Sequence, residues 1–187
     1  ELEQLNLRKN TLIIFASDNG AAIQAPIKIL NCNAGFKGRK GTLYEGGIRV
    51  PFIVNQPGMV PIQTLDNLIY FPDMMPTLAA LAKGTKHLPK QINGINILPL
   101  FYGKQVDTDN RLLYWEFPGK QRAARKGDWK CVTIHPNQPL ELYNLKEDPE
   151  ETNNLAKKYP RRVKEFDEEM QRMHIPTPNW PQPGEQF

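Results

Sequence analysis

The chain has 187 residues, of which 40% are hydrophobic and 24% charged, with 24 Lys and Arg against 20 Asp and Glu. This balance supports a folded core and excludes a disordered or low-complexity chain. No run approaches the ~18 apolar residues of a membrane helix, and the first residues lack signal-peptide features, so no membrane segment is expected. The two cysteines, Cys32 and Cys131, are too few for a disulfide scaffold and too widely spaced for a zinc motif.

The first half of the chain has the pattern of an α/β fold. Residues 11–16 form a continuous run rich in β-branched and aromatic residues that is typical of a buried strand in a parallel sheet, and residues 48–54 predict a second buried strand. A glycine-rich structured loop lies between them. Apolar residues at helical spacing predict a helix from about residue 74 to Gly84, with Asp73 as its cap.

The second half has a different pattern. Short strands separated by turn residues favour an antiparallel sheet, and a charged helix with one apolar stripe follows them, before a Pro-rich tail. The strands are expected over 112–117, 122–125, 129–134 and 140–145, and the stripe consists of Val163, Phe166, Met170 and Met173. We therefore expect part of an α/β core over residues 1–105, and an α+β subdomain over residues 106–187.

The positive charge is concentrated in two segments. Residues 28–49 hold five Lys or Arg against one Glu, and residues 119–130 hold five against one Asp. Such concentration suits an anionic partner. A nucleic-acid-binding protein is usually more basic overall and interleaves aromatic residues with its basic ones, so a small anionic ligand is the better fit. A solvated basic loop explains the charge equally well.

The first chemistry-bearing segment is Ser17-Asp18-Asn19-Gly20, directly after the first predicted strand. Ligands of open α/β sheets bind at the carboxyl ends of the strands. A carboxylate beside an amide carbonyl, without Cys or His, suits a hard cation such as Ca²⁺ or Mg²⁺, and Ca²⁺ tolerates the mixed set more readily. Asp-Asn-Gly is also common turn chemistry, and alone the turn is the favoured interpretation.

The second segment is GFKGRKGTLYEGGIRVP, residues 35–51. Its glycines let the backbone approach a tetrahedral anion, while Lys37 and Lys40 supply compact positive charges. It lacks the Gly-Lys-Ser/Thr ending of a nucleotide P-loop. A basic surface loop is the alternative.

Together these segments resemble the second half of the sulfatase family. The resemblance continues through FPDMMPTLAALA, LYWEF, RAARKGDWK and LELYNLKEDPEETNNLA, and so covers nearly the whole chain. It implies the C-terminal part of an alkaline-phosphatase-like α/β core, followed by a small α+β subdomain with an antiparallel sheet and a packed helix.

The resemblance also implies roles for single residues. Asp18 and Asn19 match calcium ligands of the family, and Lys40 matches its sulfate-contacting lysine. Lys37 and Arg122 are further candidates for substrate binding. Glu45, Gly46, Gly47 and Arg49 look more like loop-shaping residues than catalysts. Many relatives carry a His shortly after the Trp-Glu of the YWE strand, whereas this chain has Phe117-Pro118.

The family's nucleophile is a formylglycine made in a Cys/Ser-x-Pro-x-Arg sequence, and neither Cys32 nor Cys131 stands in one. We therefore expect the C-terminal portion of a sulfatase that acts on sulfate esters, with sulfated carbohydrate as the expected substrate class, and that is inactive without its N-terminal portion. The alternatives are a phosphate or phosphonate ester hydrolase of the same superfamily, and a non-catalytic module that binds anions or carbohydrate. The resemblance implies a periplasmic, secreted or lysosomal location, and no nucleic-acid partner is expected.

Overall fold

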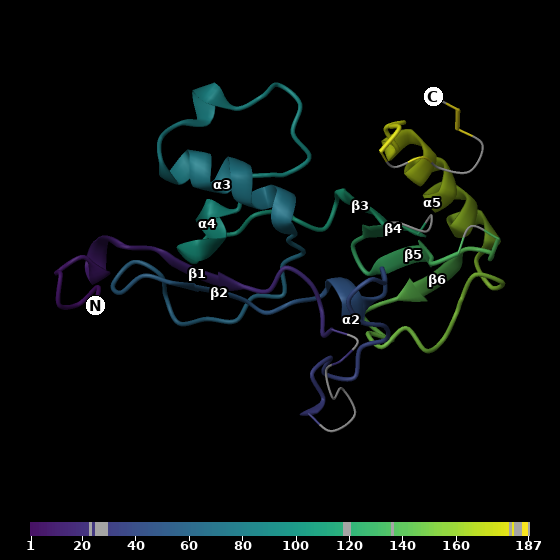
Figure 1. The fold of residues 1–187 in the computed structure, drawn as a ribbon, viewed down its shortest axis with the longest axis horizontal. Coiled ribbons are helices and arrows are strands. Elements are labelled where there is room, and N and C mark those ends of the chain that lie inside the picture. Colours follow the sequence, from purple (N-terminus) through teal and green to yellow (C-terminus); the bar gives the residue numbers. More distant parts are fainter. Residues whose placement is uncertain are drawn as a thin grey trace. The chain divides into compact units, whose positions relative to one another are not determined.

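The computed structural model describes residues 1–22, 24, 30–117, 121–135, 137–179, 181 and 185–186. The chain packs as two compact units (Figure 1). One consists of Glu1–Ala16 with Pro51–Asn110, and the other of Ser17–Val50 with Arg111–Phe187. The glycine-rich segment thus packs with the C-terminal sheet within this chain. The division expected at residues 105 and 106 concerns the domains of the family fold and stays a prediction.

The first unit contains a two-stranded sheet and several short helices. The strands are β1 (Ile13–Ala16) and β2 (Phe52–Asn55), and the α-helices are α3 (Met74–Leu81) and α4 (Leu98–Phe101). Single 3₁₀ turns occupy Arg8–Asn10, Phe71–Asp73 and Thr85–His87. The core of this unit packs Ile97, Leu100 and Phe101 against one face of the two strands.

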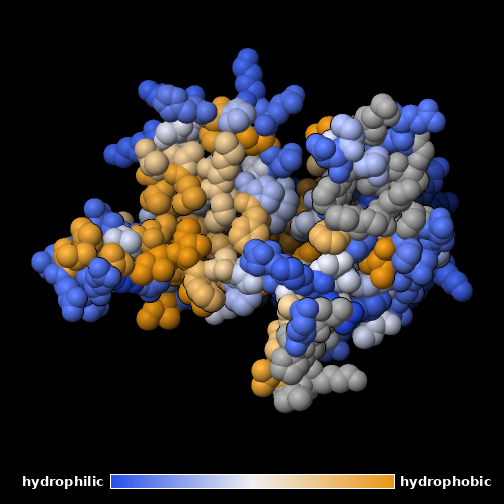
Figure 2. Space-filling model, viewed as in Figure 1, coloured by the Kyte–Doolittle hydropathy of each residue, from blue (hydrophilic) through white to orange (hydrophobic). Residues whose placement is uncertain are grey.

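Two expectations for this unit were wrong. The strand over residues 11–16 was expected to be buried in a parallel sheet, but β1 pairs antiparallel with β2 and half of its side chains are exposed. The second strand begins at Phe52 rather than at residue 48, because Glu45–Ile48 form the short helix α2. Apolar side chains gather over this unit (Figure 2), and Phe15 and Ile53 are 60% and 58% exposed.

The predicted helix after residue 73 is confirmed as α3, and Asp73 occupies its N-cap position, but its side chain makes no capping hydrogen bond to the helix. The carboxylate of Asp73 is fully buried and accepts hydrogen bonds from the backbone N–H groups of Tyr70, at 3.0 Å, and Ile95, at 2.9 Å. Asp73 therefore closes the turn before α3 and ties it to the chain that follows the helix.

The second unit is built on an antiparallel sheet in the order β3-β4-β5-β6. The strands are β3 (Leu112–Phe117), β4 (Gln121–Lys126), β5 (Trp129–Thr133) and β6 (Glu141–Asn144). Helix α5 (Pro160–Met173) packs Phe166 and Met170 against Ala124, Cys131 and Leu142. The antiparallel sheet and the packed helix of the predicted subdomain are thus confirmed.

The two faces of this sheet have different cover, because side chains alternate along each strand. Ala124 and Cys131 face α5, whereas Ala123, Val132 and Tyr143 face the other way and pack against Leu43 and Tyr44 of the glycine-rich segment. The sheet therefore serves as the platform on which residues 36–48 are held.

Candidate active site

The loop after β1 carries Asp18 and Asn19. The Ser17 hydroxyl donates to the Asn19 carbonyl at 2.8 Å, and the Gly20 N–H donates to the Gly47 carbonyl at 2.9 Å. A Cβ added at Gly20 would lie 1.8 Å from the Gly46 carbonyl oxygen, so only glycine fits there. Asp18 is exposed and Asn19 half-buried, which leaves their oxygens available to a ligand.

The glycine-rich segment folds back on itself beside this loop. The Gly46 N–H donates to the Lys37 carbonyl at 2.7 Å, and a Cβ on Gly46 would lie within 2.7 Å of three carbonyl oxygens. The Lys40 N–H donates to the Ala21 carbonyl at 2.9 Å. Backbone bonds therefore join the two predicted motifs into one piece of structure.

Lys40 lies in the turn of this segment, and its side chain is exposed. The turn is closed by Thr42, whose hydroxyl donates to the Arg39 carbonyl at 2.9 Å and accepts from the Arg39 N–H at 3.1 Å. Within the part of the chain that the structure describes, no acceptor pairs with the Lys40 ammonium. Its charge is thus available to an anion from outside.

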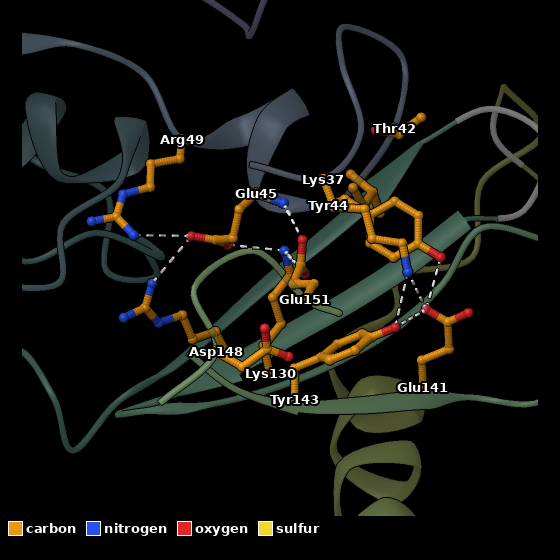
Figure 3. A network of polar contacts seen from close by, with 12 residues as sticks. Lys37, Thr42, Tyr44, Glu45, Arg49, Lys130, Glu141, Tyr143, Asp148 and Glu151 are labelled. Atoms are coloured by element: carbon orange, nitrogen blue, oxygen red, sulfur yellow. Dashed lines mark hydrogen bonds and ion pairs between the residues drawn. The ribbon is translucent and has the colours of Figure 1, made fainter. Parts of the chain in front are cut away.

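A buried ionic cluster anchors α2 to the sheet (Figure 3). The Lys130 ammonium, on β5, is fully buried and donates to Glu45 Oε1 at 2.9 Å. It also lies 2.9 Å from Glu151 Oε1, in an ion pair without hydrogen-bond geometry. Glu151 Oε2 accepts the backbone N–H of Glu45 at 2.7 Å. Arg125 and Arg49 complete the cluster, 3.6 and 3.8 Å from Glu45 Oε2.

The surroundings of Glu151 shift the pKa of its carboxyl group. Burial raises the pKa of this carboxyl above its ordinary value, although the Lys130 ammonium and the Glu45 N–H oppose the shift. Its backbone has a positive φ of 55°, a conformation that L-residues seldom adopt. A buried carboxylate with a strained backbone is costly unless its partners hold it in place.

A second polar cluster holds Lys37 (Figure 3). Its ammonium lies 4.0 Å from the ring centre of Tyr44, donates to the Tyr143 hydroxyl at 3.0 Å and pairs with Glu141 Oε2 at 3.4 Å. Both tyrosine hydroxyls also donate to Glu141. Burial alone would raise the pKa of Glu141, but the two hydroxyls and the Lys37 charge together lower it. The ammonium of Lys37 is thus engaged within the protein.

The remaining sequence candidates lie elsewhere. Arg122 projects to the α5 face of the sheet, where it pairs with Asp167 at 3.4 Å, so the structure does not bring it to the Lys40 loop. Phe117 ends β3, and Pro118 lies outside the described residues. Cys131 is buried, and burial raises the pKa of its thiol to about 12, so it is a poor nucleophile.

No group of three or more His, Cys, Asp or Glu side chains among the described residues is arranged to hold a metal ion. None of the described helices combines the length and apolar character needed to cross a bilayer.

Comparison with known proteins identifies the family. Residues 36–175 match the model of the family described as N-sulphoglucosamine sulphohydrolase, C-terminal. The chain belongs to the sulfatase family. The match includes Lys40, Glu45, Lys130 and Glu151, and it begins after Asp18 and Asn19.

Individual sulfatases match nearly all of the chain. A sulfatase of Formosa agariphila is 32% identical over 82% of it, and an N-acetylgalactosamine-6-O-sulfatase of Bacteroides thetaiotaomicron is 30% identical over 89%. A solved sulfatase structure, from work on the metabolism of glycosaminoglycans by Bacteroides thetaiotaomicron, superposes on 91% of the chain with 30% identity and a TM-score of 0.80. The fold is therefore that of the C-terminal portion of a sulfatase.

These relatives are much longer than this sulfatase chain. It covers 30% and 37% of the two curated sulfatases and 40% of the solved structure. The residues described above therefore correspond to only a part of each of those proteins.

Sequence reasoning missed the two buried charges that hold the site, Lys130 and Glu151. A lysine within GDWKCV looks like the exposed member of an alternating strand, and Glu151 looks like one acid in the charged run EDPEE. One signal for Lys130 was available. Lys130 lies two residues before Val132 in β5, so both side chains point to the face of the sheet that packs against the glycine-rich segment.

Proposed function

We propose that this chain forms the C-terminal part of the active site of a sulfuric ester hydrolase that acts on sulfated carbohydrate. The observation that carries the proposal is the pair of backbone hydrogen bonds, Gly20 to Gly47 and Lys40 to Ala21, which join the Asp18 loop to the Lys40 turn. This arrangement supports a site in which a cation held by the oxygen ligands and the positive charge of Lys40 act together on one anion.

Lys40 is proposed to contact the sulfate group. The backbone of the turn that carries its exposed side chain is fixed by Thr42, so only the side chain has to reorganise when the anion binds. Negative charge on the sulfuryl oxygens and on the leaving oxygen is the quantity to be stabilised as the S–O bond breaks. A preorganised cation placed beside that charge lowers the barrier more than it strengthens ground-state binding.

Asp18 and Asn19 are proposed to hold calcium. The donor set fits, since a carboxylate and an amide carbonyl are hard oxygen ligands and their side chains are accessible. Calcium takes about six to eight oxygen ligands, so the proposal requires further ligands from outside these two residues. When bound, the ion polarises the sulfate oxygens.

The nucleophile is proposed to come from a further, N-terminal portion of the enzyme, as a formylglycine. This chain contains no Cys/Ser-x-Pro-x-Arg sequence, and its Cys131 thiol is buried. The chain alone is therefore proposed to lack turnover. A periplasmic, secreted or lysosomal location is proposed on the family resemblance alone.

The substrate class rests on two of the relatives. One is named for 6-O-sulfated N-acetylgalactosamine and another comes from work on glycosaminoglycans, which supports a sulfated sugar over other sulfate esters. Nothing in the described residues specifically favours a phosphate ester or a non-catalytic role.

The test is steady-state kinetics of the complete enzyme with an aryl sulfate. Lys40→Ala is expected to lower kcat by about 100-fold or more, because one preorganised charge is removed from the transition state. Arg39→Ala is the matched control, an exposed neighbouring cation that should cost less than about threefold. Equal losses in the two variants would contradict the assignment of Lys40.

Lys37 separates the same proposal from a general effect of charge. It is already paired with Glu141 and two tyrosine hydroxyls, so Lys37→Met is expected to leave kcat within a few-fold of the parent. A loss at Lys37 larger than that at Lys40 would mean that the assignment is misregistered within the loop.

A further inference from the structure

The buried cluster around Lys130 joins three parts of the sequence at one point. Glu45 is the first residue of α2, Lys130 lies on β5, and Glu151 follows β6. The Lys130 ammonium is 2.9 Å from an oxygen of each carboxylate, and all three side chains are 3% exposed or less. Glu151 also accepts a hydrogen bond from the Glu45 backbone N–H at 2.7 Å, so the cluster binds the main chain of α2 as well as the Glu45 side chain.

Such a cluster is a poor device for stability alone. Charges taken out of water lose their hydration, and their mutual attraction does little more than recover that loss, so a well-packed apolar replacement is often as stable. Glu151 adds a second cost, because its backbone is held at a φ of 55°. Buried charge and backbone strain at the same residue are features of sites where geometry is controlled.

What the cluster controls can be followed along the backbone. Helix α2 begins five residues after Lys40, and Gly46, its second residue, donates to the Lys37 carbonyl at 2.7 Å. The next residue, Gly47, accepts the N–H of Gly20, which directly follows Asp18-Asn19. A shift of α2 on the sheet would therefore displace the Lys40 turn and the Asp18 loop together.

We propose that Glu45, Lys130 and Glu151 are positioning residues for the sulfate site, which fix α2 on the sheet and thereby set the position of Lys40. This inference rests on the proposed function. In this proposal the three side chains touch neither substrate nor metal. They act through the backbone of residues 40–47. Misplacement of a charge by about 1 Å lowers turnover strongly, so a loosened α2 should reduce kcat in an enzyme that remains folded.

The test is a double-mutant cycle on kcat in the complete enzyme, with an aryl sulfate as substrate. Lys130→Met keeps the length of the side chain and removes its charge. It is expected to lower kcat by about 10- to 100-fold in the parent, with KM within a few-fold. In the Lys40→Ala background the same substitution is expected to cost a clearly smaller factor than in the parent, because the Lys40 ammonium, one of the groups that it positions, is gone. Lys146→Met, an exposed lysine after β6, is the matched control and should change kcat in neither background.

The outcomes separate this inference from the proposed function. If Lys40→Ala itself leaves kcat unchanged, the proposed function fails. If Lys40→Ala lowers kcat but Lys130→Met has no effect, or costs the same factor in both backgrounds, the positioning role is overturned. Rates are normalised to the folded fraction measured by near-ultraviolet circular dichroism.

A second variant covers the case in which Lys130→Met does not fold. Glu151→Gln keeps the oxygen that accepts the Glu45 N–H and removes the charge that faces Lys130. It is expected to show the same dependence on Lys40 as Lys130→Met. If neither variant folds, the cluster is needed for folding itself and the positioning role is overturned.

Discussion

The backbone N–H of Gly20 lies 2.9 Å from the carbonyl oxygen of Gly47 and donates to it. These residues are 27 positions apart in the sequence and belong to the two different motifs, and the bond joins them through main-chain atoms. The contact is built from backbone alone, and side chains have no room at either residue, since a Cβ on Gly20 would lie 1.8 Å from the Gly46 carbonyl oxygen and one on Gly47 would lie 2.0 Å from the Thr42 carbonyl oxygen. Substitutions that push the two segments apart should act on the whole site.

Gly20→Ala tests this contact through stability. The added Cβ would lie 1.8 Å from the Gly46 carbonyl oxygen and 3.1 Å from the Gly47 Cα, so the backbone must move. Overpacking of this kind costs about 1–3 kcal/mol, and we expect a loss in that range in urea unfolding of the chain. Gly84→Ala is the control, because its nearest neighbour would be 3.8 Å away and its φ is −105°. Equal stability of the two variants would contradict the close approach.

Calcium binding should depend on Asp18 and on the completeness of the protein. Two oxygen ligands fall far short of the number that calcium requires, so the chain alone is expected to bind it weakly and the complete enzyme tightly. Asp18→Ala should weaken binding to the complete enzyme by at least about tenfold, because the charged ligand is lost. Asp66→Ala, in the other unit, is the control. Submicromolar binding by the chain alone in titration calorimetry, abolished by Asp18→Ala, would show that no further ligands are needed.

A third prediction concerns pH and the imidazole of His174, at the end of α5. Its Nδ1 lies 2.6 Å from Glu116 and its Nε2 lies 2.6 Å from Glu185, and Glu116 also accepts the hydroxyl of Tyr114. Burial opposes protonation of the ring, but the two carboxylates outweigh it and raise the pKa of His174 above its ordinary value of 6.5.

A raised pKa in the folded state means that the protonated ring stabilises the fold. This contribution is complete below the unfolded pKa of about 6.5 and disappears as the pH rises through the folded pKa. His174→Gln should therefore destabilise the chain at about pH 5.5 and much less at about pH 8.5, in urea unfolding at both values. His135→Gln, on the exposed loop after β5, should leave this dependence unchanged. A deficit of His174→Gln that is independent of pH would show that the ion pairs do not contribute.

The local patterns of the sequence predicted much of the structure. The alternation along β4 and β5 and the apolar stripe of α5 each depend on residues close in the chain, and the sheet and its helix were found where expected. The Asp18 and Lys40 motifs were also recognisable, because glycines at fixed spacing indicate close backbone approach. What these motifs hold stays a prediction.

Long-range pairing was not predictable in the same way. The run over residues 11–16 is apolar at every position after Thr11, so its pattern indicates burial on both faces, but it does not specify a partner or a direction. The burial of Lys130 depends on Glu45, 85 residues earlier, and on Glu151. No single segment contains the information that these charges meet.

The final prediction concerns association of the chain through β1 and β2. In this antiparallel pair Phe15 lies opposite Ile53, and their side chains, 60% and 58% exposed, share one face with Ile13. Among the described residues each of these strands pairs only with the other, so each retains an unpaired edge. An apolar face next to open strand edges promotes self-association.

The chain alone should therefore show an apparent mass above that of a monomer in light scattering. The double variant Phe15→Gln with Ile53→Gln should return it toward the monomer, whereas Ile175→Gln, an apolar residue 77% exposed in the other unit, should not. A parent chain that remains monomeric at high concentration would contradict self-association through this face.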